Sequence, residues 1–179
     1  MGNSVGMIEL SSIAKGIETC DYMLKAADVE LLRSCTICPG KYMIIIGGDT
    51  SSVNASMEVG EEIASEFLVD KLLIANVCDQ LMPAISSTSQ VPTDGAVGVI
   101  EFYSVASALV AADTAAKAAA INLIEVRTGF AIGGKGFVTM SGDVSAVNAA
   151  IEAAEAVSEL MIYSTVIPRP TDKLYEALM

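Results

Sequence analysis

Two cysteines at C-x-x-C spacing, Cys35 and Cys38, are the residues of this chain best suited to chemistry. Such a pair can form a redox dithiol, supply two ligands of a zinc site, or act as two separate thiols. The chain has four cysteines and no histidine. The commonest general base and the commonest zinc ligand are therefore both missing.

The position of the pair argues against the first two chemistries. A redox dithiol needs its motif at the start of a helix, whereas this one ends a predicted strand over 29–37 and runs into Pro39-Gly40. A zinc site would normally need a second pair of ligands, and no second C-x-x-C exists. Residues three apart on a strand point to opposite faces. We therefore expect Cys35 to pack within a sheet and Cys38 to project from the following loop.

A glycine-rich segment, Gly129-x-x-x-x-Gly134-Lys135-Gly136, is close to a phosphate-binding P-loop. The hydroxyl residue that would hold Mg²⁺ is replaced by Gly136. A P-loop must also open a helix, but the apolar run over 137–140 predicts a strand. We reject nucleotide binding here and expect the glycines to let the backbone bend.

Composition narrows the class of protein. The 179 residues are 53% apolar and carry a formal net charge of −12, which excludes a nucleic-acid partner. The longest apolar stretch, 105–123, contains Asp113 and Lys117, so we expect no membrane span. The first residues lack the basic and apolar regions of a secretory signal, so we do not expect a secreted protein. We expect the remaining cysteines, Cys20 and Cys78, to be buried thiols. The apolar content exceeds what a domain of about 90 residues needs for its own core. We expect the excess apolar surface to be buried against other chains, which predicts an oligomer.

A long internal repeat organises the chain. Val5-Gly6-Met7-Ile8-Glu9 returns as Val97-Gly98-Val99-Ile100-Glu101, and Asp21-x-x-x-Lys25-Ala26-Ala27 returns as Asp113-x-x-x-Lys117-Ala118-Ala119, at an offset of 92. Lys41 and Gly48-Asp49-x-Ser51-x-Val53-Asn54-Ala55 return as Lys135 and Gly142-Asp143-x-Ser145-x-Val147-Asn148-Ala149, at an offset of 94. A repeat of this length is a duplicated domain, and the copies differ by two residues near position 33–41.

Each copy is predicted to be an α+β domain with the ferredoxin-like order β-α-β-β-α-β. The first copy is expected to have strands over 5–10, 29–37, 42–46 and 72–77, with helices from Ser11 or Ser12 to 27 and from Ser51 or Ser52 to 67. The second copy is expected to have strands over 97–102, 122–128, 136–140 and 162–167, with helices over 104–119 and 144–157. We assign residues 1–82 and 96–179 to the two domains and 83–95 to a linker. The alanines of helix 104–119 favour packing on its own sheet, and the alternative is a helix contact with a neighbouring subunit.

These motifs, in this order and in both halves, resemble the bacterial microcompartment shell domain. Two fused copies are similar to the tandem-domain trimeric shell proteins. The resemblance covers about residues 4–170 and implies a structural protein rather than an enzyme: a homotrimer that forms a pseudo-hexameric, six-lobed tile. The implied location is the shell of a microcompartment in the cytoplasm. Other shell proteins would pack edge to edge with the tile, and an encapsulated redox enzyme is a further expected partner.

The resemblance also assigns residues to the tile's edge and pore. Lys25 and Lys117 match the family's edge lysine, and Arg169, in Ile167-Pro168-Arg169-Pro170, matches its other edge residue. Without the resemblance, each lysine would be interpreted as a solvated residue at a helix C-terminus, where its charge suits the helix dipole. The expected pore-lining residues lie in two loops: Ile37, Cys38, Pro39, Gly40, Phe130, Ala131, Ile132 and Gly133.

A three-fold axis would gather three copies of Cys38, and three thiolates approach the four that hold a [4Fe–4S] cluster. Some tandem shell proteins of propanediol-utilisation compartments carry such a cluster, one per trimer, on one cysteine per chain, and Cys38 matches that position. The resemblance thus implies electron transfer or cluster exchange at the pore. One alternative is a metal-free pore that conducts small polar metabolites, with Cys38 as a free thiol. Another is a small-molecule sensor or enzyme on the same fold.

Overall fold

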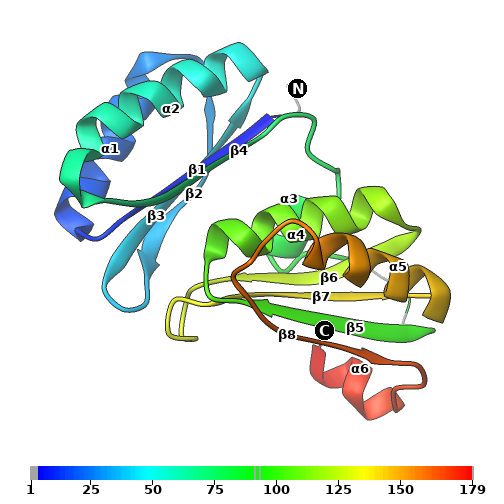
Figure 1. The fold of residues 1–179 in the computed structure, drawn as a ribbon. Helices are drawn as coiled ribbons and strands as arrows, with labels where there is room; N and C mark the ends of the chain where they lie inside the picture. The colour runs from blue at the N-terminus through cyan, green and yellow to red at the C-terminus, as the bar shows by residue number, and fades with distance from the viewer. Residues whose placement is uncertain (1–3, 91, 93, 179) are drawn as a thin grey trace. The chain divides into compact units, whose positions relative to one another are not determined.

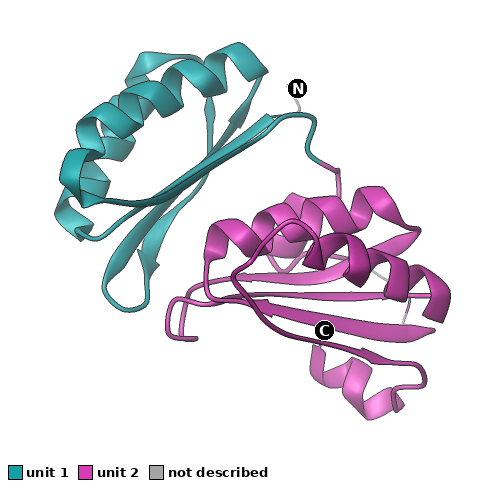
Figure 2. Ribbon diagram, in the orientation of Figure 1, with its two compact units in different colours: residues 1–77 teal, residues 78–179 magenta. Residues whose placement is uncertain are grey.

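The computed structural model describes residues 4–90, 92 and 94–178. The chain divides into two compact units, Met1–Val77 and Cys78–Met179 (Figure 2). Each unit has its own four-stranded sheet with two long helices. The predicted duplication of an α+β domain is therefore confirmed.

The first unit follows the predicted element order (Figure 1). Its sheet has the strand order β2-β3-β1-β4, with every neighbouring pair antiparallel. The elements are β1 (Ser4–Leu10), α1 (Ile13–Ala26), β2 (Glu30–Ile37), β3 (Lys41–Gly48), α2 (Thr50–Ala64), the 3₁₀ turn η1 (Ser65–Phe67) and β4 (Leu68–Ile74).

The second unit repeats this arrangement with the strand order β6-β7-β5-β8. It also contains two short helices, one before its first strand and one after its last. The elements are α3 (Leu81–Ile85), β5 (Ala96–Phe102), α4 (Val105–Ala118), β6 (Ile121–Thr128), β7 (Gly136–Gly142), α5 (Val144–Glu155), β8 (Met161–Ile167) and α6 (Asp172–Leu178). None of the helices in the described parts of the chain combines the length and the apolar character of a membrane span.

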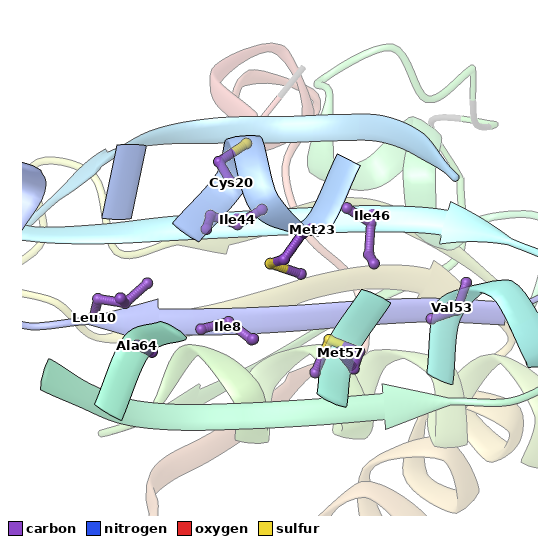
Figure 3. Packing of buried hydrophobic residues seen from close by; sticks show 9 residues of the cluster. All are labelled: Ile8, Leu10, Cys20, Met23, Ile44, Ile46, Val53, Met57 and Ala64. Atoms are coloured by element: carbon purple, nitrogen blue, oxygen red, sulfur yellow. The ribbon is translucent and has the colours of Figure 1, made fainter. Parts of the chain in front are cut away.

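The core of the first unit lies between its sheet and its two helices (Figure 3). Alternate residues of the two central strands point toward the helices, as the pleat requires. Gly60 on α2 is needed for this close packing, because a Cβ there would lie 2.5 Å from Ile8 Cδ1. The cluster consists of Ile8, Leu10, Cys20, Met23, Ile44, Ile46, Val53, Met57 and Ala64.

Several predicted boundaries differ from the observed ones. Helix α2 ends at Ala64, and β4 occupies 68–74 instead of the predicted 72–77. The first residues of the predicted linker 83–95 belong to helix α3, whose Ala84 and Ile85 are buried in the second unit. Its residues 91 and 93 lie outside the described residues, as do 1–3 and 179. Helix α6 was not predicted.

The alanine-rich helix α4 packs against elements of its own unit. It contacts α5, β6 and β7, and its buried residues include Ala108, Ala111, Ala112 and Ala115. Small side chains let the helix backbone lie close to the sheet. The alanines therefore serve the packing of this helix on its own sheet, as the first interpretation predicted.

The two N-terminal caps of the long helices in the first unit have different chemistry. Ser12 caps α1 as predicted and accepts a hydrogen bond from the Lys15 backbone N–H at 3.3 Å. Asp49, rather than Ser51 or Ser52, caps α2. Its Oδ1 accepts hydrogen bonds from both serine backbone N–H groups at 3.0 Å. These bonds, together with those from both serine hydroxyls, hold the pKa of Asp49 far below its usual range.

We predict that Asp49→Ala lowers the melting temperature of the protein by about 4 °C near neutral pH. Because the folded-state pKa is lowered, this stabilisation is present above the unfolded pKa of about 4 and is lost as the pH falls through the folded-state value. Thermal unfolding followed by circular dichroism between pH 7 and pH 2 measures it. Asp143→Ala is the matched control, because Asp143 caps α5 without a side-chain hydrogen bond. Equal effects of both variants would contradict the prediction.

Candidate functional site

The β2–β3 hairpin positions Cys38. Ile37 pairs with Lys41 at the end of the ladder, and the three turn residues 38–40 connect the strands. The Gly40 N–H donates to the Ile37 carbonyl at 3.0 Å, and Gly40 has a φ of +82°, which favours glycine. The Cys38–Pro39 peptide bond is cis. Cys38 is thus the first residue of a tight turn with Ile37 buried at its base.

The two cysteines of the C-x-x-C lie in different settings. Cys35 is within β2, opposite Met43 of β3, whereas Cys38 lies beyond the end of the ladder. Both are half-buried, and neither forms a disulfide. Because the motif spans a strand end and a turn, it lacks the helix N-terminus that a redox dithiol uses.

The other two cysteines are poor candidates for ligands. Cys20 is 7% exposed and belongs to the core of the first unit, where the Ser34 hydroxyl donates to its sulfur at 3.6 Å. Cys78 is half-buried, and burial together with the nearby Asp113 carboxylate raises its pKa. Its thiol therefore stays protonated near neutral pH. Cys20 is buried as expected, while Cys78 is only partly so.

The described residues of one chain do not gather the three ligands of a metal site. Among residues 4–90, 92 and 94–178, no three histidine, cysteine or carboxylate side chains cluster in a way that could hold a metal ion. Any cluster held by Cys38 would therefore need thiols from several copies of the chain.

The β6–β7 hairpin has a longer and chemically different tip. Thr128 pairs with Gly136, so seven residues, 129–135, separate them, whereas the corresponding pair Thr36 and Tyr42 is separated by the five residues 37–41. The two extra residues of the second copy therefore lie at this tip. Gly129, Ala131, Gly133 and Gly134 all have positive φ, and Phe130 is 59% exposed. Gly136 begins strand β7, so the P-loop interpretation is excluded by the local structure.

An ion pair lies at the base of each hairpin. In the first unit Lys41 Nζ contacts Glu9 Oε1, and the Glu9 side chain is only 3% exposed. In the second unit Lys135 Nζ lies 3.5 Å from Glu101 Oε2, and both side chains are 40% or more exposed. Glu101 and Lys135 also line a cavity of about 480 Å³ with Ile132 and Phe137. These pairs were not predicted, although all four residues stand in the repeated motifs.

The three proposed edge residues are all exposed, but their surroundings differ. Lys25 pairs with Asp21 on the surface of α1, and the hydrogen bond to that carboxylate raises the pKa of Lys25. Lys117 lies 2.5 Å from Asp113, whose side chain is 8% exposed and also accepts from the Cys78 N–H at 2.7 Å. Arg169 is exposed between β8 and α6. The structure thus shows accessible positions for all three, and their role in assembly stays a prediction.

Comparison with known proteins identifies the family. Residues 4–77 and 96–170 each match the BMC domain. The bacterial microcompartment shell protein PduT of Citrobacter freundii is 43% identical over 182 residues, covering 100% of this chain and 99% of that protein. The carboxysome shell protein CsoS1 of Prochlorococcus marinus is 35% identical over 77 residues, covering 43% of this chain and 74% of that protein.

Solved structures agree with this assignment. A crystal structure of a microcompartment protein from Desulfitobacterium hafniense DCB has a TM-score of 0.92 and 42% identity, covering 97% of this chain and 98% of that one. A fused permuted hexameric shell protein of the RMM microcompartment shares the fold, with a TM-score of 0.61 and 20% identity.

The chain belongs to the BMC domain family and contains two tandem copies of the domain. It is a structural shell protein of a bacterial microcompartment, and its place is the shell of that compartment inside the bacterial cell. The relatives named above are shell proteins rather than enzymes, as the resemblance implied.

We predict that Glu9→Gln lowers the free energy of unfolding of the first unit by about 2 kcal/mol, because it leaves the Lys41 ammonium without its buried counter-charge. Urea unfolding followed by circular dichroism measures the change. The matched control is Glu101→Gln, which removes the exposed pair and should cost under about 0.5 kcal/mol. A Glu9→Gln variant as stable as Glu101→Gln would contradict the prediction.

Proposed function

We propose that three chains form a six-lobed shell tile whose central pore binds one [4Fe–4S] cluster through Cys38 of each chain. The observation that carries this proposal is the setting of Cys38: a single half-buried thiol at the first position of a tight hairpin turn. The corresponding hairpin of the second unit has no cysteine. A trimer of two-domain chains would therefore present three thiols at its pore instead of six.

The chemistry of the donor set fits an iron–sulfur cluster. Thiolates are the usual ligands of such clusters, and three of them hold three of the four iron atoms. The fourth iron would have a non-protein or backbone ligand. When bound, the cluster would supply one-electron transfer across the shell or a site for cluster exchange, and a redox enzyme inside the compartment would be its partner.

The cluster proposal is tested by anaerobic purification. We expect a brown trimer with a broad absorbance near 400 nm and about four iron and four sulfide per three chains. Cys38→Ser should lose the colour and most of the iron while remaining a trimer.

Cys35→Ser is the matched control, because it removes the other thiol of the same hairpin from within the ladder. It should retain the cluster. A Cys38→Ser protein with full colour, or equal loss in both variants, would overturn the proposal.

We also propose that Lys25 contributes to edge-to-edge packing of tiles. Lys25→Ala should abolish or shrink two-dimensional sheets seen by electron microscopy while the trimer remains intact, because the exposed Asp21–Lys25 pair contributes little to folding. Lys117→Ala is a less clean test, since it also leaves the buried Asp113 without its cation. Unchanged sheets with Lys25→Ala would contradict the edge role.

The second candidate function is a metal-free tile whose pore passes small polar metabolites. The tip of the second hairpin favours it, because Gly133 at that tip has open space around it and no thiol is nearby in sequence. A colourless, iron-free trimer after anaerobic reconstitution would support this candidate over the cluster.

A further inference from the structure

The internal repeat extends into the two short helices α3 and α6. Ile74 of β4 and Ile167 of β8 occupy equivalent positions, opposite Val5 and Val97. At this offset of 93, Leu81, Ala84 and Ile85 of α3 correspond to Leu174, Ala177 and Leu178 of α6. The preceding residues correspond as well: Cys78 with Thr171, Asp79 with Asp172, and Gln80 with Lys173. The two helices are therefore copies of one element.

Helix α3 covers the outer edge of the second unit's sheet. The Gln80 side chain donates to the Ile121 carbonyl at 3.1 Å and accepts from the Leu123 N–H at 2.8 Å. Just before it, the Cys78 N–H donates to Asp113 at the end of α4. Leu81 and Ala84 are fully buried, and Leu123 is only 1% exposed. The segment thus satisfies backbone groups of edge strand β6 and buries apolar surface.

The equivalent surface of the first unit is exposed. Leu31 on β2, the counterpart of Leu123, is 41% exposed. Ile17 on α1 is 56% exposed, whereas its counterpart Leu109 is fully buried. Asp21, the counterpart of the buried Asp113, is also exposed. This apolar strip along β2 and α1 is the surface that an element like α3 would cover.

Helix α6 has an incompletely packed apolar side that fits the strip. Tyr175 anchors the helix to its own unit, with its hydroxyl donating to the Asp94 carbonyl at 2.7 Å and the Gly95 carbonyl at 3.1 Å. Leu174 and Leu178 are only half-buried and Ala177 is exposed, unlike their counterparts on α3. Ala177 and Leu178 line a cavity of about 430 Å³ together with Ile124 and Phe137 of their own unit, so the helix does not fill the space beside it.

We propose that α6 of one protomer packs on β2 and α1 of the next, as α3 packs on β6 and α4 within a chain. The inference rests on the proposed trimer and names its contact surfaces. In this contact the Thr171 N–H donates to Asp21, and Leu174 and Leu178 cover Leu31 and Ile17. A contact between two different surfaces of the same chain closes into a three-membered ring when each copy is rotated by about a third of a turn from the last.

The charges at this contact are complementary only between chains. Within the chain, Asp79 and Gln80 line one pocket with Asn122, and Ala120 precedes β6, so the β6 side of the contact carries no charge at these positions. At the equivalent positions, α6 carries Lys173, while the β2 surface carries Asp28 and Glu30. Lys173 therefore faces two carboxylates in the proposed contact. This difference favours α6 over α3 on the first unit's surface.

Charge reversal tests the contact, with the dissociation constant of the trimer measured by sedimentation at low salt. Lys173→Glu and Glu30→Lys should each weaken the trimer by about tenfold or more, because like charges then face each other at three contacts. The double variant Lys173→Glu/Glu30→Lys should recover most of that loss. Two single variants with wild-type dissociation constants, or a double variant as weak as their sum, would overturn the proposal.

A pair of core variants separates association from folding. Leu174→Asp should dissociate the trimer and leave the melting temperature of the isolated chain unchanged. Leu81→Asp, at the equivalent position of α3, should instead lower the melting temperature of the chain at every protein concentration. A Leu174→Asp protein that remains trimeric would overturn the α6 contact and leave the proposed tile standing. A wild-type protein that is monomeric at all concentrations would overturn both.

Discussion

The antiparallel pairing of the two central strands is the interaction on which each unit depends. In the first unit β1 pairs with β3 from Ser4–Gly48 to Leu10–Tyr42, and β5 pairs with β7 in the same way in the second. This register turns Ile8 and Ile44 toward the helices. A shift by one residue would turn them away, so the pairing cannot change without loss of the core. The two hairpin tips consequently occupy equivalent positions, each within its own unit.

Because the ladders are constrained, the two copies differ in length and in backbone conformation mainly where the ladders stop. The hairpin tips do so, with a thiol in a three-residue turn in one unit and a longer glycine-rich tip in the other. The short helices after the sheets do so as well, with Gln80 in one and Lys173 in the other. In the proposed trimer, duplication would let a ring of similar lobes carry a different chemistry at alternate positions.

The same repeated motif also acquires different physical properties in the two units. Asp21 and Lys25 form an exposed pair that contributes little to stability, whereas Asp113 is buried and holds both Lys117 and the Cys78 N–H. The Glu–Lys pairs at the hairpin bases differ in the opposite direction. Glu9 of the first unit is buried, whereas the Glu101 side chain of the second unit is 40% exposed. Neither unit therefore has the more buried carboxylate at both motifs. The burial of each ion pair depends on the residues that pack against it.

The sequence by itself determined the duplication, the order of the eight strands and four long helices, and the place of Cys38 in a turn. Periodicity and turn residues act over a few positions, and Pro39-Gly40 is such a local signal. The tertiary structure decided the rest. Helices as short as α3 and α6 do not form from propensity alone and exist because Leu81, Ala84 and Tyr175 are buried. The burial of Asp113 depends on the Cys78 N–H, 35 positions away, which no local pattern of residues records.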